Sequence, residues 1–205
     1  GNANFLWVQH FAHHLSPNGQ AGFVMPNGAL AVSGKEGELR KKLIEDDLVD
    51  VIISCPSKLF YNVSLPVSLW FLAKNKGGDR FRNRKGETLF IDARDTFEQI
   101  SRKQVIFNKE QIAKITNTVR AWRDEKGAPK YKDIPGFCKS ANLEEIKKNG
   151  YTLTPGRYVG LADIEDDGIS FEEKMQKLSV ELREGFTKGR GLEKDIEKNL
   201  KELGF

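Results

Sequence analysis

The spacing of apolar residues predicts alternating helices and strands at the start of the chain. Apolar side chains recur at helical intervals over residues 3–15, which predicts an amphipathic helix. Residues 21–25 form a short apolar run, and Pro26-Asn27-Gly28 turns the chain after it. This combination predicts a buried parallel strand with a loop at its carboxyl end. A second helix is expected over residues 36–45.

Two further apolar runs predict the centre of a sheet. Residues 48–54 are mostly apolar and end before Pro56, and residues 67–73 are rich in β-branched and aromatic side chains. Only about ten residues separate the runs, without a helical pattern, whereas a parallel crossover normally needs a dozen or more. The second of these strands is therefore expected to run antiparallel to the first. The order of elements indicates the α/β class.

Downstream of the sheet, the pattern becomes more helical. Residues 88–92 predict an edge strand, and residues 109–125 carry apolar side chains on one helical face. Residues 126–168 are expected to be rich in loops, with a short helix around residues 143–148. From Ser170 the chain is expected to be helical to its end, and broken or kinked near Gly185, Gly189 and Gly191.

Composition excludes several classes of protein. With 39% hydrophobic and 30% charged residues, the chain of 205 residues is expected to be folded and soluble. Its longest nearly apolar stretch, residues 63–73, is too short to span a bilayer, and no signal peptide is evident. Cys55 and Cys138 are far apart, which suits a reducing cytoplasm and argues against a zinc site. The net charge of +4 permits contacts with nucleic-acid phosphates without demonstrating them.

Six ordered blocks of sequence carry a resemblance to a known family. They are "NANFLWVQHFAHHL" (2–15), "SPNGQAGFVMPNGAL" (16–30), "GELRKKLIEDDLVDVIISCPSKLFYN" (37–62), "LPVSLWFLAKNK" (65–76), "LFIDAR" (89–94) and "GYTLTPGRYVG" (150–160). In this order and spacing, they resemble the part of type I restriction–modification methylase subunits that follows the catalytic motif. An amphipathic C-terminal helix closes the series, so the resemblance covers nearly the whole chain.

The resemblance implies a fold, an activity and partners. The fold is the second half of a Rossmann-like methyltransferase sheet with an antiparallel last strand, followed by a helical C-terminal region. The reaction transfers a methyl group from S-adenosylmethionine to the N6 amine of adenine in double-stranded DNA. The implied partners are a specificity subunit and a restriction subunit. The corresponding divisions of the chain are residues 1–95, 96–168 and 169–205.

Two parts that this reaction requires are missing from the sequence. There is no Gly-rich loop between a strand and a helix to hold the cofactor, because the glycines at 34 and 37, or at 189 and 191, follow no strand. The Asn/Asp-Pro-Pro-aromatic loop that holds the target amine is also missing. In the family's layout both parts lie upstream of Gly1. The chain alone is therefore expected to be inactive and to bind no cofactor.

Two groups of residues are candidates for the reaction site. Phe60 and Tyr61 stand where related amine methyltransferases place an aromatic ring against the flipped base, although both rings could instead fill the core. Pro26, Asn27 and Gly28 follow a strand, where ligands bind in open α/β sheets; a plain turn is the alternative. The resemblance places this turn near the cofactor or the base.

Basic residues offer a candidate DNA contact. Four of them stand in a loop flanked by glycines and could contact phosphates, or could equally be solvated: Arg80, Arg82, Arg84 and Lys85. A metal site at His10, His13 and His14 is not expected, because no carboxylate is placed to join them. Arg157 and Tyr158, in the block "TLTPGRY", are expected to be a structural anchor.

An apolar stripe in the last segment is the candidate partner surface. Its members recur at intervals of three and four: Phe171, Met175, Leu178, Leu182 and Phe186. Such a stripe is expected to dock a partner helix, unless it folds back on the chain's own domain. Two other functions remain open at this stage. One is an assembly module without enzymatic activity, and the other is an RNA or protein methyltransferase on the same sheet.

Overall fold

The computed structural model describes residues 3–61, 63–78, 80–161 and 170–204, apart from the side chains of Phe171 and Lys174. The chain forms two compact units, Gly1–Asp163 and Ile164–Phe205. The first contains every strand, and the second is a single helix, α5. Among the described helices, none combines the length and apolar character that crossing a membrane requires.

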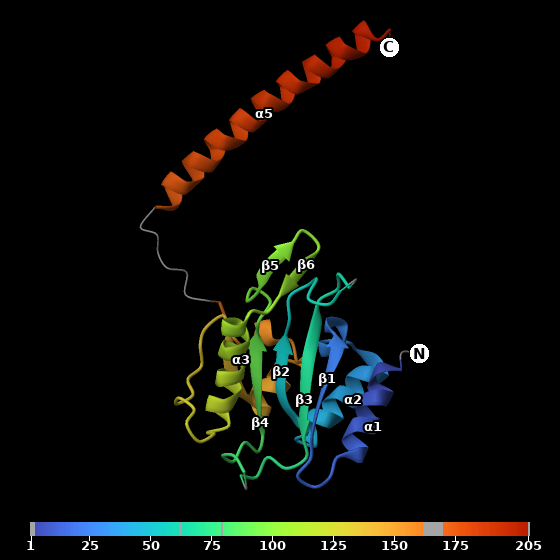
Figure 1. Ribbon diagram of the computed structural model, residues 1–205, viewed down its shortest axis with the longest axis vertical. Helices are drawn as coiled ribbons and strands as arrows, with labels where there is room; N and C mark the ends of the chain where they lie inside the picture. Colours follow the sequence, from blue (N-terminus) through green and yellow to red (C-terminus); the bar gives the residue numbers. More distant parts are fainter. Residues whose placement is uncertain (1–2, 62, 79, 162–169, 205) are drawn as a thin grey trace. The chain divides into compact units, whose positions relative to one another are not determined.

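A mixed five-stranded sheet is the centre of the first unit (Figure 1). Its strands lie in the order β1 (Gln20–Pro26), β3 (Val67–Ala73), β2 (Val49–Ser54), β4 (Glu87–Asp92) and β7 (Cys138–Asn142). β3 pairs antiparallel with both β1 and β2, β2 pairs parallel with β4, and β7 pairs antiparallel with β4. The strands β1, β2 and β4 therefore all end at the same edge of the sheet, which we call the carboxyl edge.

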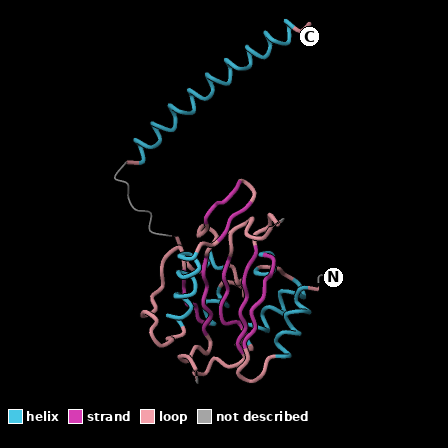
Figure 2. Tube along the Cα trace, viewed as in Figure 1, coloured by secondary structure: helices cyan, strands magenta, loops and turns pink. Residues whose placement is uncertain are grey.

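Helices cover the two faces of this sheet, as the tube drawing in Figure 2 shows. One face packs against α1 (Asn4–His14), α2 (Gly34–Glu45), α4 (Leu143–Lys148) and the short 3-10 helices η1 (Asn27–Leu30) and η2 (Pro155–Arg157). The other face packs against α3 (Lys109–Trp122). Alternation along β2 separates the two cores: Ile52 faces the first, and Val51 and Ile53 face the second.

Most of the predicted elements are present, and the antiparallel direction predicted for residues 67–73 is confirmed. The burial and the parallel pairing predicted for residues 21–25 are wrong. β1 runs in the same direction as β2 and β4, but its only described partner is the antiparallel β3, and it is a half-exposed edge strand. The edge position predicted for residues 88–92 is also wrong. β4 is internal, since β7, which the sequence pattern did not predict, covers its outer side.

Residues 96–163 belong to the same compact unit as the sheet. β7 completes the sheet, and the ring of Tyr158 stacks on Phe90 of β4 with centroids 3.9 Å apart. The hydroxyl of Tyr158 donates a hydrogen bond to the carbonyl of Thr152. Residue 95 is therefore not a boundary between compact units, and the block around Tyr158 forms a structural anchor, as expected.

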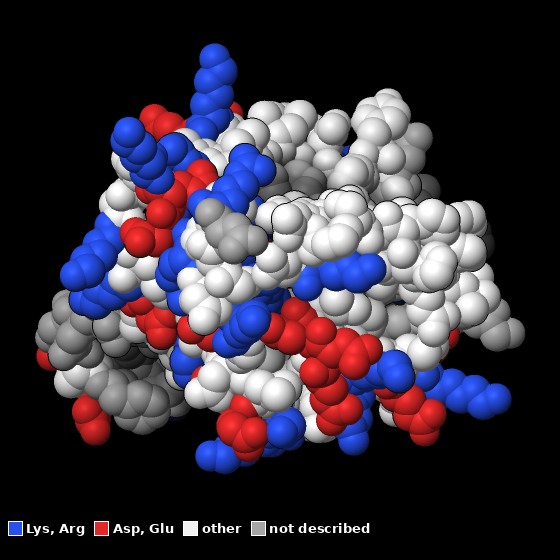
Figure 3. All heavy atoms as spheres, turned by 90° about the horizontal axis from the view of Figure 1, so that it is seen from below, with Lys and Arg blue, Asp and Glu red and all other residues white. Residues whose placement is uncertain are grey.

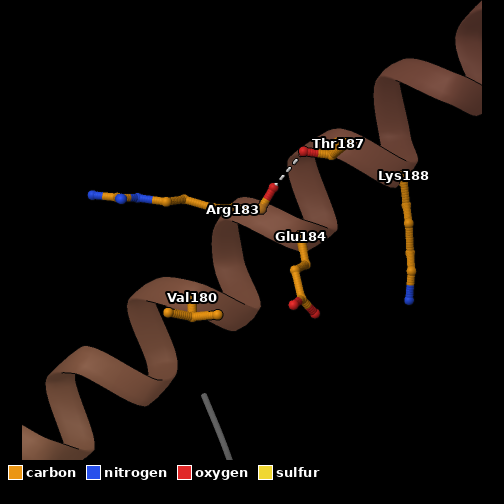
Figure 4. Close-up of a pocket in the computed structure, with 5 residues that line it drawn as sticks. All are labelled: Val180, Arg183, Glu184, Thr187 and Lys188. Atoms are coloured by element: carbon orange, nitrogen blue, oxygen red, sulfur yellow. Dashed lines mark hydrogen bonds between the residues drawn. The ribbon is translucent and has the colours of Figure 1, made fainter.

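The second unit is one continuous helix, α5 (Phe171–Glu202), of 32 residues. The break predicted near its glycines is wrong, because the helix runs through Gly185, Gly189 and Gly191. Apart from the nearby backbone of the helix itself, no described atom lies within 4 Å of the place where a Cβ would stand on any of the three. The hollow drawn in Figure 4 is lined by five residues of α5 alone, so it is a surface groove of a single helix.

Candidate functional site

Two of the predicted groups lie on segments at the carboxyl edge of the sheet. The backbone N–H of Asn27, after β1, donates to the carbonyl of Pro66 at 3.4 Å, and Pro26 pairs with Val67. On the other side of β3, the N–H of Cys55 donates to the carbonyl of Val67 at 2.9 Å. The turn after β1 and the loop between β2 and β3 therefore meet at the start of β3.

The loop between β2 and β3 presents Phe60 and Tyr61 to solvent. Leu59 packs against the core, and Lys58 adopts a left-handed conformation, with φ of 62°. The next two rings are 42% and 78% exposed, for Phe60 and Tyr61 respectively. Phe60 forms an isolated bridge with Val63, whose N–H donates to its carbonyl at 3.1 Å. Neither ring fills the core, so the alternative that the two rings are core side chains does not hold.

A pocket of about 530 Å³ opens beside Tyr61. One wall is the loop between β2 and β3, and the other is the tip of a hairpin formed by β5 (Glu98–Ser101) and β6 (Gln104–Ile106). This hairpin projects beyond the carboxyl edge in Figure 1. The pocket is lined by Lys58, Tyr61, Val63, Ser64, Ser101, Arg102, Lys103 and Gln104. The apolar pattern of the sequence does not predict this hairpin. The one sign of it in the sequence is a pair of basic residues, Arg102 and Lys103, between two short segments.

The turn after β1 is held rigidly. Asn27 and Gly28 begin η1, which ends at the buried Leu30. The carbonyl of Leu30 accepts a hydrogen bond from the N–H of Leu153 at 2.8 Å, and the guanidinium of Arg40 donates to the carbonyl of Ala29 at 3.3 Å. The side-chain oxygen of Asn27 is buried and has no hydrogen-bond partner among the described residues. Asn27 therefore keeps one unsatisfied acceptor at the carboxyl edge.

The basic loop between β3 and β4 lies at the opposite edge of the sheet. Arg84 is 1% exposed, and its Nε donates to Asp50 Oδ1 at 3.2 Å. Arg82 Nη2 lies 2.6 Å from Glu87 Oε2, and this contact lowers the pKa of the Glu87 carboxyl. The burial of Arg84 revises its predicted contact with DNA phosphate, since its guanidinium neutralises a buried carboxylate instead. Only Arg80 and Lys85 remain exposed in this group.

The charges at this second edge have both signs. Figure 3 views it from below and shows Lys and Arg side chains interspersed with Asp and Glu. Lys76, which is also buried here, places its ammonium 2.6 Å from Asp47 Oδ1, and burial lowers the pKa of this lysine. The edge therefore does not present one continuous basic surface. The basic loop and the aromatic pair belong to different sites.

The cysteines and histidines offer little reactive chemistry. Burial raises the pKa of the Cys55 thiol to about 11, and burial is also the main reason that the pKa of Cys138 is raised. Both thiols are protonated at neutral pH, which makes them poor nucleophiles. His14 Nδ1 lies 2.8 Å from the carbonyl of His10. In the part of the chain that the structure describes, no group of three potential metal ligands is found.

Comparison with known proteins identifies the family of this chain. The family described as N-6 DNA Methylase matches residues 1–167. The type I restriction enzyme MjaIX methylase subunit of Methanocaldococcus jannaschii is 50% identical over the whole chain, which covers 36% of that protein. The HindI methylase subunit of Haemophilus influenzae is 48% identical over the whole chain, which covers 44% of it.

A solved structure supports the same assignment. The type I restriction-modification methyltransferase subunit from Streptococcus thermophilus aligns with a TM-score of 0.65 and 33% identity. The alignment covers 77% of this chain and 30% of that protein. The chain thus spans less than half the length of the relatives it matches. From its sequence and its fold together, the chain belongs to the N-6 DNA methylase family.

Proposed function

We propose that this chain is part of an adenine-specific DNA methyltransferase subunit of a type I restriction–modification system, acting in the cytoplasm. The observation that carries the proposal is identity near 50% to two type I methylase subunits over the full length of the chain. In the proposed reaction, the whole subunit transfers a methyl group from S-adenosylmethionine to adenine N6 in double-stranded DNA. Within that subunit, this chain contributes one side of the site.

The residues present do not fit S-adenosylmethionine by themselves. The pocket beside Tyr61 carries Lys58, Arg102 and Lys103 and no acidic side chain in its lining, whereas the cofactor bears a sulfonium cation. Asn27 supplies one buried acceptor, but no Gly-rich turn accompanies it in the sequence. The rest of the subunit therefore has to supply the cofactor site.

The isolated 205-residue chain is expected not to bind S-adenosylmethionine in isothermal titration calorimetry. The physical reason is that both the Gly-rich loop and the Asn/Asp-Pro-Pro-aromatic loop are missing from its sequence. The complete subunit, titrated under the same conditions, is the positive control. Micromolar binding by the isolated chain would contradict our account of which part of the site it contains.

The role proposed for Phe60 and Tyr61 is to stack on the target base. An adenine that leaves the duplex loses its stacking on neighbouring bases. Stacking on an aromatic ring restores about 1–3 kcal/mol of that lost interaction energy. An exposed ring on the loop at the carboxyl edge, clear of the core, can receive such a base. Tyr61 is the more exposed of the two and lines the pocket, while Phe60 is held by its bridge to Val63.

Substituting these rings is expected to lower methylation more than DNA affinity. In the complete subunit assembled with its specificity subunit, Phe60→Ala or Tyr61→Ala should reduce turnover by about ten- to a hundredfold, because a stacking contact is lost while phosphate contacts persist. Fluorescence of 2-aminopurine at the target position reports the flipped base. Leu65→Ala is the matched control, since Leu65 is also apolar and 67% exposed in the same loop. Unchanged turnover in both aromatic variants would exclude a stacking role.

We further propose that α5 docks the specificity subunit through its apolar stripe. The stripe is exposed along the described part of the helix, as at Leu178, Leu182 and Phe186, which are each 58% exposed. The side chain of Phe171 lies outside the described part. The alternative function, an assembly module without enzymatic activity, would need only this helix. The restriction subunit would then join the assembled complex.

A further inference from the structure

The hairpin beside Tyr61 is fixed to the loop that carries the aromatic pair. The N–H of Val105 in β6 donates to the carbonyl of Lys58 at 3.1 Å, and the ammonium of Lys58 donates to the carbonyl of Arg102 at 3.1 Å. Within the hairpin, Val105 of β6 is buried, whereas all four residues of β5 are exposed. The hairpin therefore extends from a fixed base and holds its tip next to Tyr61.

Positive charge is concentrated around this pocket. Lys58, Arg102 and Lys103 line it, and none of the three forms an ion pair with any residue that the structure describes. The nearest acidic residue of the hairpin, Glu98, accepts a hydrogen bond from Asn108 at the start of α3. Hydroxyl and amide groups of Ser64, Ser101 and Gln104 complete a lining that suits an anion.

We infer that this pocket binds backbone phosphates of the DNA strand that carries the target adenine. The inference rests on the proposed function and extends it to a second set of contacts. A base that stacks on Tyr61 remains attached to its sugar and to the phosphates on both sides, so this strand has to pass close to the ring. Three cations that form no ion pair with the described residues stand beside that ring, and each neutralised phosphate strengthens binding by releasing counterions.

The same geometry assigns the phosphate contacts to the carboxyl edge instead of the opposite edge. There, Arg82 and Arg84 already neutralise Glu87 and Asp50. At the hairpin, the charges of Arg102 and Lys103 remain available, and both side chains are exposed. The contact is expected to be independent of DNA sequence, because phosphate contacts position a protein while base contacts specify.

The test compares two double variants of the complete subunit, assembled with its specificity subunit. Arg102→Gln with Lys103→Gln removes two charges from the hairpin, and Lys35→Gln with Lys42→Gln removes two charges from exposed positions of α2. Fluorescence anisotropy with a labelled 30-base-pair duplex is measured at several potassium chloride concentrations. The hairpin variant should lower the magnitude of the slope of log K against log salt by about two, because each phosphate contact contributes about one. The α2 variant should retain the slope of the parent.

A second measurement localises the contact. The methylated adenine is mapped first, and single phosphates next to it are then replaced by neutral methylphosphonates. At one or two positions, the replacement should weaken binding of the parent several-fold and leave the hairpin variant unaffected.

An unchanged salt slope in the hairpin variant, while the parent still methylates, would overturn the inference and leave the proposed function intact. Loss of the specificity subunit from the hairpin variant would assign the pocket to a protein partner instead. A parent without methylation would refute the proposed function.

Discussion

Replacing Asp50 by asparagine is expected to lower the free energy of unfolding by about 3–5 kcal/mol. Asp50 is fully buried in β2, and its carboxylate lies 3.2 Å from Arg84 Nε and 2.8 Å from Arg123 Nη2. The amide keeps the shape of the side chain but removes its charge. Two guanidinium groups, whose side chains are 1% and 13% exposed, would then lie in the core without a counter-ion. Charges of this kind are costly to bury unless they are paired.

Urea denaturation monitored by tryptophan fluorescence measures this change. Trp70 and Trp122 are buried in the first unit, and α5 contains no tryptophan, so the signal reports on the sheet and its helices. Glu125→Gln is the matched control, because Glu125 pairs with Arg120 at 3.3 Å on the surface, where a loss of at most about 1 kcal/mol is expected. Equal losses in the two variants would show that the buried carboxylate contributes no more than a surface one. Adding Arg84→Met to Asp50→Asn should recover part of the stability.

The buried charges mark one limit of what the sequence could predict. A loop with several arginines suggests a segment that is solvated or that binds DNA. The number of charges alone does not distinguish these two roles from a structural role in the core. The sequence of β2 did contain a sign of the structural role, because Asp50 interrupts an apolar run that was predicted to be buried. A carboxylate at such a position requires a cation. Applied to the strand, that rule would have assigned one of the arginines to the core.

The sheet shows a second limit. Direction could be predicted where chain length decided it, as for β3, because a short connection cannot cross over. The positions of β1 and β4 in the sheet depend on strands that lie far away in the sequence. β7 carries Lys139 and Ser140 between short apolar residues, so its composition gives little sign of a strand. Pairing with β4 stabilises it, and this pairing determines which strand is the edge.

The candidate site was predicted in part. The exposed aromatic pair and the turn at Asn27 were found from the order of sequence blocks, and the structure brings both to one edge. The hairpin at Arg102 and Lys103 was missed, because its four-residue and three-residue strands are too short for a periodic pattern. Two hydrogen bonds hold the hairpin next to Tyr61. The residues that they join are separated by 44 and 47 positions in the sequence. Contacts at that separation are invisible to local analysis.

The middle of the apolar stripe of α5 follows a seven-residue repeat, which favours a helical partner. Met175, Leu178 and Leu182 begin the repeat, and continuing the same spacing places Gly185 and Gly189 in consecutive layers before Leu192 and Ile196. Each glycine lowers the stability of an isolated helix by about 1 kcal/mol relative to alanine. A helix of 32 residues that carries three glycines and an exposed apolar stripe gains little from its own sequence. Packing against a partner would compensate, and glycines on the stripe would let the partner's backbone approach closely.

Leu178→Glu combined with Leu182→Glu is therefore expected to abolish co-purification of the specificity subunit. Two carboxylates would be placed in consecutive layers of a buried interface, where an unpaired charge is strongly unfavourable. Val180→Glu combined with Thr187→Glu is the matched control, because both residues lie on another face of α5, beside Arg183, Glu184 and Lys188 in Figure 4.

The control variant should retain the partner, and the melting temperature of the first unit should be the same in both variants and the parent. If the stripe instead packs against the chain's own first unit, the leucine variant would lose several degrees of melting temperature as an isolated chain and still bind the specificity subunit. If the leucine variant retains the partner and its melting temperature is unchanged, the stripe neither docks the specificity subunit nor packs against the first unit. Only a loss of the partner that is confined to the leucine variant supports docking through α5, because the two variants differ in the face that receives the charge.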